Sequence, residues 1–186
     1  SFWLTLRKIE KIKKRYLEQV FGIEQLSNST PWSYSSFLDC MRKDYEFYVC
    51  LENEKVQGFF IASFSLLEGH LLNISVAPNM KRQGIGNELL NKVETIANKF
   101  GIKEIFLEVR ESNKEAISFY KTNKFTEIGL RKNYYKLYNG REDALIFSKK
   151  LRNDFFSLKQ IFYILSNILR LRIRWVTLNY LTIFID

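Results

Sequence analysis

Residues 73–100 read NISVAPNMKRQGIGNELLNKVETIANKF, which predicts a strand, a glycine-containing turn and a helix in that order. Pro78 ends the strand, because proline cannot donate a ladder hydrogen bond. The helix should run from about residue 85 to Phe100, and Gly101 stops it. One face of this helix is apolar at helical spacing. That face comprises Ile85, Leu89, Leu90, Val93, Ile96, Ala97 and Phe100.

The turn before this helix has the chemistry of an anion site. Residues 82–87 read Arg-Gln-Gly-Ile-Gly-Asn and present backbone N–H groups at a helix N-terminus, where the helix dipole favours negative charge. The segment is not a Walker A loop, because G-x-x-x-x-G-K-[ST] is absent from the chain. It is not G-x-G-x-x-G either, since residue 89 is Leu. Taken alone, a G-x-G pair is more often just a tight turn, so pyrophosphate binding needs support from the surrounding sequence.

The remaining elements follow from hydrophobic periodicity and turn residues. We expect a short strand at 2–9, a helical run through about residue 26, and a short helix from Ser33 or Ser35 to Arg42. Further strands are expected at 46–51, 56–67, 70–76, 103–109, 125–135 and 142–150, with a helix from a capping box at Ser112 to about Thr122. This order predicts a mixed α/β fold whose sheet is largely antiparallel and flanked by helices.

Composition excludes several kinds of chemistry. The chain has 186 residues, 46% of them hydrophobic, which suits one globular domain with an appendage. His70 is the single histidine, and Cys40 and Cys50 match no zinc-site spacing, so no metal is expected. Two isolated cysteines suit a reducing compartment, the cytoplasm or an organelle interior. The sequence contains no stretch of 18 uncharged apolar residues, so it predicts no transmembrane helix.

The net charge of +9 is concentrated at the two ends. Residues 1–20 carry +4 and residues 149–186 carry +5, whereas residues 21–148 are neutral. We therefore assign 1–150 to one domain and 151–186 to a basic, apolar C-terminal extension of unknown role. An added strand, an amphipathic surface element touching a membrane and a poorly ordered extension are all consistent with the extension. No direct contact with nucleic acid is expected.

Several motifs in order resemble the GNAT acetyltransferase superfamily, and within it the RimI-type N-terminal acetyltransferases. The resemblance covers about residues 9–150. Its motifs are residues 73–87 above, Leu107-Glu108-Val109-Arg110-Glu111-Ser112-Asn113, Ala116-Ile117-Ser118-Phe119-Tyr120, Asn133-Tyr134-Tyr135 and Gly140-Arg141-Glu142-Asp143-Ala144, with Ile23-Glu24-Gln25 and Pro31-Trp32-Ser33 earlier.

This resemblance implies a GNAT fold, acetyl-CoA as co-substrate, and direct transfer of acetyl to the N-terminal alanine of a ribosomal protein. It implies that Ile74, Ser75 and Val76 hold the pantetheine arm and the acetyl carbonyl through backbone groups. The pyrophosphate would lie against Arg82, Gln83, Gly84, Ile85, Gly86 and Asn87, and Asn113 would contact CoA or simply cap its helix.

Two residues are candidates for proton transfer. Glu108 lies in an apolar strand, and burial would raise the pKa of its carboxylate toward that of a general base. The alternative is a strand glutamate that faces solvent or pairs with Arg110. Tyr120 matches the family's general acid for the CoA thiolate, and its local alternative is a core aromatic residue. A single histidine leaves no Ser-His-Asp triad unless His70 serves in it, although we expect His70 to be structural.

The acceptor side is less defined. Tyr134, Tyr135, Arg141 and Glu142 are expected to line it or to pack at its rim, and Glu24 could attract a basic acceptor or simply face solvent. Three departures from the family stand out, and the first is that residues 152–186 have no counterpart in it. Lys81 replaces Gln or Arg, so a positive charge is kept or gained and phosphate binding should be retained. Lys124 replaces a glycine, and a non-glycine residue in a left-handed cap costs about 1 kcal/mol, a strain that Asn123 could relieve by taking that conformation itself.

Other functions use the same features. A GNAT enzyme could act on a lysine, a small amine or a broader set of N-termini, and the fold does not distinguish these acceptors. A non-catalytic acyl-CoA-binding module associated with ribosomes or membranes is a further alternative, with residues 152–186 as its docking element. The presence of both Glu108 and Tyr120 argues against lost catalysis.

Overall fold

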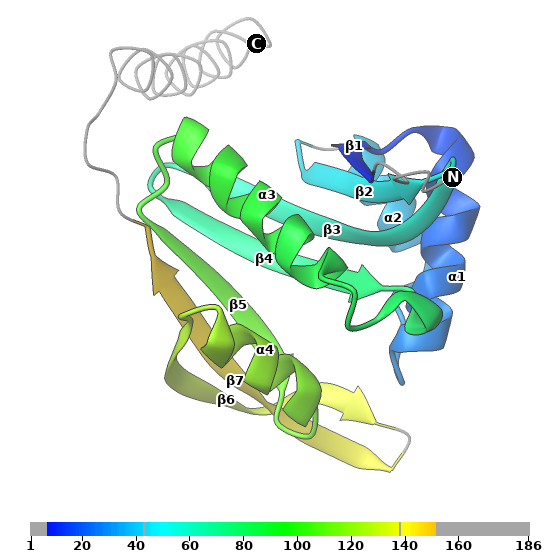
Figure 1. Cartoon of the computed structure of the whole chain (residues 1–186). Coiled ribbons are helices and arrows are strands. Elements are labelled where there is room, and N and C mark those ends of the chain that lie inside the picture. Colours follow the sequence, from blue (N-terminus) through cyan, green and yellow to red (C-terminus); the bar gives the residue numbers. More distant parts are fainter. Residues whose placement is uncertain (1–6, 43, 138, 152–186) are drawn as a thin grey trace, which may run out of the picture.

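The computed structural model describes residues 7–42, 44–137 and 139–151. Within them, seven strands form one sheet in the order β1-β2-β3-β4-β5-β7-β6, and only β4 and β5 pair in parallel (Figure 1). The strands are β1 Lys8–Lys11, β2 Glu46–Glu52, β3 Lys55–Ser65, β4 Glu68–Val76, β5 Glu104–Arg110, β6 Thr126–Leu137 and β7 Gly140–Lys150. The predicted mixed, mostly antiparallel sheet is confirmed.

Helices cover both faces of this sheet. α3 Ile85–Lys99 and α4 Lys114–Thr122 pack on one face, and α1 Leu17–Ser27 and α2 Tyr34–Arg42 pack on the other. Single turns of 3-10 helix, η1 Lys14–Tyr16 and η2 Pro78–Met80, precede α1 and the turn before α3. None of the helices in the described residues combines the length and apolarity needed to span a membrane.

The two faces share the central strand β3. Phe60 and Ala62 pack toward α3, whereas Phe59 and Ile61 pack toward α1 and α2, and all four are completely buried. Burial on both faces explains why this stretch reads as a continuous apolar run rather than an alternating one. The strand therefore forms a rigid base against which the neighbouring strand β4 is positioned.

β4 and β5 pair only at one end, and this divergence creates the space for a site. Their register runs from Glu68 opposite Glu104 to Leu71 opposite Leu107, yet β4 continues to Val76 and β5 to Arg110. Beyond that point the strands splay apart (Figure 1). The β3–β4 ladder shifts register at the same level, because Ile61 faces Asn73 while Ala62 faces Leu71. Such a bulge bends and twists the strand that carries it.

The predicted elements between residues 46 and 150 lie within a few residues of the bounds expected from the sequence. The N-terminal expectation was partly wrong. Residues 8–11 form the strand β1, which pairs with β2, and α1 begins only at Leu17. Ladder hydrogen bonds to β2 and packing of Ile9 against the core favour the extended form over the helical one in this stretch.

The C-terminal end of α4 also differs from expectation. Lys124 itself takes the left-handed conformation with φ of 67°, whereas Asn123 keeps φ of −86°. The Asn123 amide is already committed, because it donates to the Phe119 carbonyl at 2.9 Å and to Asn87 Oδ1 at 3.1 Å. The strain therefore falls on the lysine rather than on the asparagine.

The proposed extension is outside the described residues, apart from Leu151. The Leu151 N–H donates to the Lys103 carbonyl at 2.8 Å, next to the start of β5. The division of the chain at residue 150 stays a prediction.

Candidate active site

A pocket of about 300 Å³ lies between the end of α1, β4, the turn before α3, the first turn of α3 and one side of α4. Of the twelve site residues predicted from the sequence, ten line it. They are Ile74, Ser75, Val76, Arg82, Gly84, Ile85, Gly86, Asn87, Asn113 and Tyr120. Gln83 and Glu108 are not among the lining residues. The pocket also includes residues that the sequence did not single out as site residues, namely Ser27, Asn28, Met80, Lys81, Glu115, Ala116 and Phe119.

The strand side of the pocket is backbone. Ile74, Ser75 and Val76 pair with β3 on one edge of β4, while β5 has already diverged from the other edge. That second edge therefore offers backbone N–H and C=O groups to a bound molecule. Gly58 on β3 allows β4 to approach this closely, because a Cβ at residue 58 would lie only 2.8 Å from the Ser75 carbonyl oxygen.

The turn before α3 is built for an anion. Gly84 is the N-cap of the helix with φ of 83°, and Arg82 is also left-handed with φ of 60°. The Gly84 carbonyl accepts the Glu88 N–H, so the N–H groups of residues 85–87 precede the first helical hydrogen bond. Unpaired N–H groups at a helix start, beside a guanidinium, suit a pyrophosphate. Gly86 also keeps the wall tight, since a Cβ there would lie 3.3 Å from the Phe119 ring.

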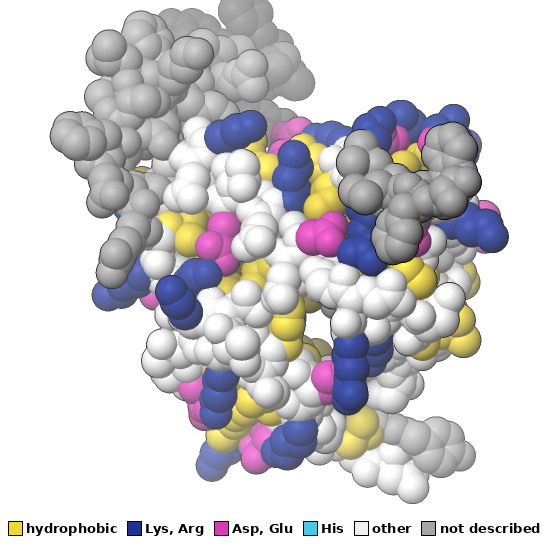
Figure 2. Space-filling view, in the orientation of Figure 1, with side chains coloured by type: hydrophobic (Ala, Val, Ile, Leu, Met, Phe, Trp, Pro, Cys, Tyr) yellow, Lys and Arg dark blue, Asp and Glu magenta, His cyan; other side chains and the backbone are white. Residues whose placement is uncertain are grey.

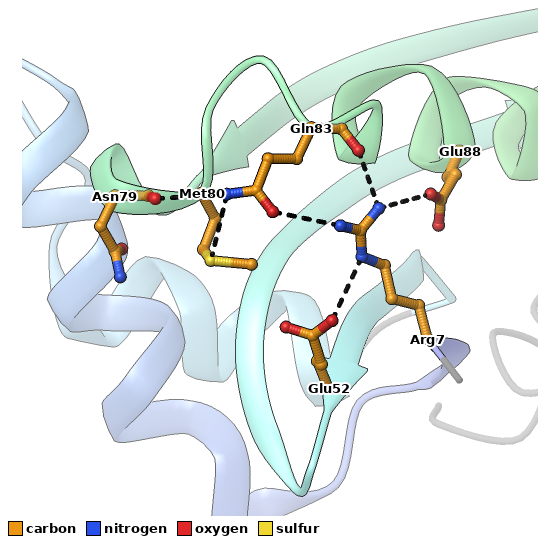
Figure 3. Close-up of polar contacts among 6 residues, drawn as sticks. All are labelled: Arg7, Glu52, Asn79, Met80, Gln83 and Glu88. Atoms are coloured by element: carbon orange, nitrogen blue, oxygen red, sulfur yellow. Dashed lines mark hydrogen bonds and ion pairs between the residues drawn. The ribbon is translucent and has the colours of Figure 1, made fainter. Parts of the chain in front are cut away.

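Gln83 is placed differently from its neighbours in the turn. Its side chain lies against the η2 turn, where its Nε2 is 3.5 Å from the Asn79 carbonyl oxygen and 3.7 Å from Met80 Sδ (Figure 3). Its carbonyl and its side-chain oxygen both accept from Arg7. Gln83 therefore supports the turn from outside.

Asn113 has the capping role that the sequence offered as its alternative. It is the N-cap of α4, and its Oδ1 accepts the Ala116 N–H at 3.1 Å. It also lines the pocket, so the two interpretations are compatible.

Tyr120 closes the inner end of the pocket. It lies on α4 with only 7% of its surface exposed, and its ring contacts those of Phe119, Phe125 and Phe147. Burial, with a smaller contribution from Tyr135, raises the pKa of Tyr120 well above its ordinary value. The phenol therefore stays protonated through the neutral range and is available as a hydrogen-bond donor or acid.

Glu108 lies on the opposite face of the sheet from Tyr120. Its strand neighbours Leu107 and Val109 pack in the same core as Tyr120, so alternation turns Glu108 the other way. The side chain is 29% exposed rather than buried as expected, and it pairs with Arg131 of β6 at 3.1 Å. Arg110, its partner in the alternative interpretation, is bound instead to Glu142 at 3.1 Å and to Thr30.

Tyr134 and Tyr135 connect the two faces near the strand divergence. A hydrogen bond to Glu108 raises the pKa of Tyr134. Burial, followed by the charge of Glu108, raises the pKa of Tyr135 to about 12. The Arg110 guanidinium lies 4.2 Å from the centre of the Tyr135 ring. Tyr135 contributes to the raised pKa of Tyr120, and the charge of Glu108 contributes to the raised pKa of Tyr135. Tyr135 therefore interacts electrostatically with both predicted catalytic residues.

The arrangement is therefore two-sided. An anion-binding pocket with a protonated phenol lies on one face, and a carboxylate held among arginines and tyrosines lies on the other, with the β4–β5 divergence between them. No three His, Cys, Asp or Glu side chains in the described part of the chain gather as a metal site would require. Basic and acidic side chains alternate over the face seen in Figure 2 rather than forming one patch.

Comparison with known proteins decides the family. Residues 6–125 match the model of the acetyltransferase (GNAT) family. The chain belongs to the GNAT family. The [ribosomal protein bS18]-alanine N-acetyltransferases of Escherichia coli K12 and Haemophilus influenzae Rd are 36% and 34% identical to this GNAT protein. These alignments cover 76% and 74% of the chain, and 95% and 94% of the two relatives.

Solved structures agree with this assignment of the GNAT chain. The ribosomal-protein-S18-alanine N-acetyltransferase of E. coli superposes with a TM-score of 0.72 at 32% identity, over 82% of this chain and all of that one. Ard1 from Thermoplasma volcanium gives a TM-score of 0.73 at 27% identity, over 78% of this chain and 98% of that one. The GNAT fold and the acetyltransferase class expected from the sequence are confirmed.

One assignment on the acceptor side of this GNAT enzyme changes. Glu24 is completely buried and accepts from Trp32 N at 3.0 Å, Asn28 Nδ2 at 2.8 Å and Asn73 Nδ2 at 3.1 Å. It therefore cannot attract a basic substrate from solvent. Its position at i+4 from Val20, another buried residue of α1, could have indicated this burial.

Arg141 also has a structural contact, because it donates to the Asn133 carbonyl at 2.9 Å and braces the β6–β7 hairpin. Arg131, the partner of Glu108 in this GNAT site, was not found from the sequence. It becomes visible only once the strand register is known.

Proposed function

We propose that this GNAT acetyltransferase uses acetyl-CoA to acetylate the N-terminal alanine of a ribosomal protein. The observation that carries the transfer chemistry is that Tyr120 lines the pocket, while Glu108 follows the last β4–β5 pair and lies on the other face of the sheet. The acceptor follows from the relatives named for ribosomal protein bS18, which are aligned over about their whole length. With a ribosomal protein as acceptor, the reaction would take place in the cytoplasm or an organelle interior.

The pocket supplies the donor side. The first N–H groups of α3 and the Arg82 guanidinium would bind the pyrophosphate, while Val76, Ile85 and Phe119 provide an apolar wall for the pantetheine arm. The free edge of β4 at residues 74–76 would hold that arm by backbone hydrogen bonds. A backbone N–H on this edge would also donate to the acetyl oxygen, where negative charge develops during attack.

The opposite face supplies the acceptor side. An α-amine has an ordinary pKa of roughly 7.7–8.0, so only a modest base is needed to make it neutral. Glu108 would take that proton, directly or through water, and Arg131 and Tyr134 hold its carboxylate in position. The neutral amine forms the N–C bond and the C–S bond breaks. The departing thiolate then takes the Tyr120 proton. Glu108 passes the first amine proton to solvent and takes the second from the amide nitrogen, and the Tyr120 phenolate regains a proton from solvent.

The test is CoA release with a peptide panel. Peptides starting with Ala, Ser, Met and Gly are compared with an N-terminally blocked peptide that contains internal lysines. We expect turnover on the free alanine terminus and none on the blocked peptide. Glu108→Gln should lower kcat/KM by about 10²-fold or more, the usual contribution of a general base.

Glu104→Gln is the matched control, because Glu104 lies on the same face of β5 four residues earlier. It should retain wild-type kinetics. Turnover on the blocked peptide alone would replace the proposed acceptor with a lysine. Binding of acetyl-CoA without turnover on any peptide would contradict the proposed substrate altogether.

A further inference from the structure

Arg7 lies just before β1 and reaches the turn that precedes α3 (Figure 3). Its Nη1 donates to the Gln83 carbonyl oxygen at 2.8 Å and to Glu88 Oε1 at 2.9 Å. Its Nη2 donates to Gln83 Oε1 at 3.3 Å, and its Nε lies 3.6 Å from Glu52 Oε1. The side chain is 22% exposed, so these contacts are partly shielded from solvent. One guanidinium therefore joins β2, the turn and the first turn of α3.

The contact with the Gln83 carbonyl has a geometric consequence for the pocket. In a trans peptide the C=O and the following N–H point in opposite directions, and the described residues contain no cis bond. Gln83 lies outside the pocket and Gly84 lines it. Holding the carbonyl outward therefore turns the Gly84 N–H inward. Gly84 needs such a constraint, because glycine on its own samples many backbone conformations.

The contact with Glu88 has an electrostatic consequence. An acid in the first turn of α3 interacts favourably with the helix dipole, but it would also repel an anion bound at the same helix end. The Glu88 Oε1 atom lies 4.0 Å from where a Cβ on Gly84 would be, so the carboxylate is close to the turn. The ion pair with Arg7 offsets this negative charge.

We propose that Arg7 is a positioning residue for the pyrophosphate of the acetyl donor. It fixes the Gln83–Gly84 peptide with its N–H toward the pocket and neutralises Glu88 beside it. This inference rests on acetyl-CoA being the donor, as proposed above, and does not depend on the acceptor.

The test measures donor affinity separately from chemistry, on the full-length chain. Calorimetric titration with CoA is made on wild type, Arg7→Gln, Arg7→Lys and the control Lys11→Gln. Lys11 lies at the end of β1, four residues after Arg7, where its side chain is 62% exposed and its Nζ is 3.9 Å from Glu46 Oε1. Lys11→Gln therefore removes one positive charge without removing the contacts to the turn. Arg7→Gln should weaken CoA binding by about tenfold, as expected for losing charge-assisted hydrogen bonds. The CoA affinity of Arg7→Lys should lie between those of the wild type and Arg7→Gln, because one ammonium cannot make both the carbonyl and the carboxylate contacts with the same geometry.

The kinetic readout separates positioning from a general loss of structure. In Arg7→Gln the KM for acetyl-CoA should rise by the same factor, whereas kcat at saturating donor and the KM for the acceptor should not change. Unchanged CoA affinity would overturn the proposal. An equal loss in Lys11→Gln, or a fall in kcat and melting temperature together with affinity, would also overturn it. If only the acceptor assignment were wrong, Arg7→Gln would still weaken CoA binding, whereas none of the peptides would be acetylated by the wild type.

Discussion

Tyr120 owes its proposed role to its burial. The pKa of this phenol is raised above its ordinary value, so the proton is lost only well above neutral pH. We therefore expect the activity of the wild type to show no alkaline decline caused by Tyr120 below about pH 10, the ordinary value for a tyrosine. Tyr120→Phe should lower kcat by about 10²-fold, and by the same factor across the pH range, because it removes an acid that is protonated throughout. Initial rates at saturating substrates measure both effects.

Tyr48→Phe is the control for this substitution. Tyr48 lies on β2, stacks on Phe60 with ring centres 5.3 Å apart, and is not a pocket residue. It should leave kcat unchanged. If the Tyr120→Phe loss diminished as the pH rose toward 9, the phenol would be titrating in that range and its assignment as a persistently protonated acid would be wrong.

Single residues also show where sequence-based prediction reached its limit. The residues around Glu108 were enough to place it on a strand. Its partner Arg131 could not be predicted, because the two residues are brought together only by the pairing of β7 with both β5 and β6. Glu24 was identified within its motif, yet its environment was misjudged. Its three donors come from the C-cap of α1, the following loop and β4, and only the last of these is distant in sequence.

At the scale of an element, the end of α4 contains a strained residue. Lys124 has φ of 67°, a conformation that costs a side-chain-bearing residue about 1 kcal/mol or more and costs glycine little. Lys124→Gly should therefore stabilise the protein by about 0.5–1 kcal/mol, after the larger chain entropy of glycine in the unfolded state is counted. Chemical denaturation gives the free energy of unfolding directly.

Asn123→Gly tests the same turn from the other side. Asn123 is not left-handed, and its amide links the α4 end to Asn87 on α3. This variant should lower the free energy of unfolding, because glycine removes both side-chain hydrogen bonds and gains no relief of strain. A stabilising Asn123→Gly together with a neutral Lys124→Gly would show that the strain lies at residue 123.

The elements themselves were largely predictable, whereas the divergence of β4 and β5 was not. Apolar runs, the capping box at Ser112 and the glycine after α3 each mark a local boundary. The divergence depends on a parallel pairing between Glu68 and Glu104, far apart in the chain, and on a bulge at Leu72. Neither has a local sequence signal, and the family resemblance implied only which residues of β4 would hold the donor.

At the scale of the whole molecule, the described residues form one sheet of seven strands, of which β7 is the last in sequence. β7 lies between β5 and β6, and every predicted site residue lies before Lys150. Truncation tolerance follows from the burial and hydrogen bonding of the backbone that is removed. A chain ending at Leu151 keeps the bond from its N–H to the Lys103 carbonyl. We therefore expect this chain to retain kcat/KM within about twofold on the alanine peptide.

The removed residues carry five basic and two acidic side chains among many apolar ones, so their contribution should appear in association rather than in catalysis. Binding of the full-length chain to ribosomes or anionic vesicles should weaken with salt, as contacts between unlike charges do, and should be reduced in the truncated chain. Pelleting at two salt concentrations measures this, with the melting temperature as the control for folding. A large fall in kcat/KM on truncation at an unchanged melting temperature would show that residues 152–186 contribute to the active site. The domain would then have to be extended beyond residue 150.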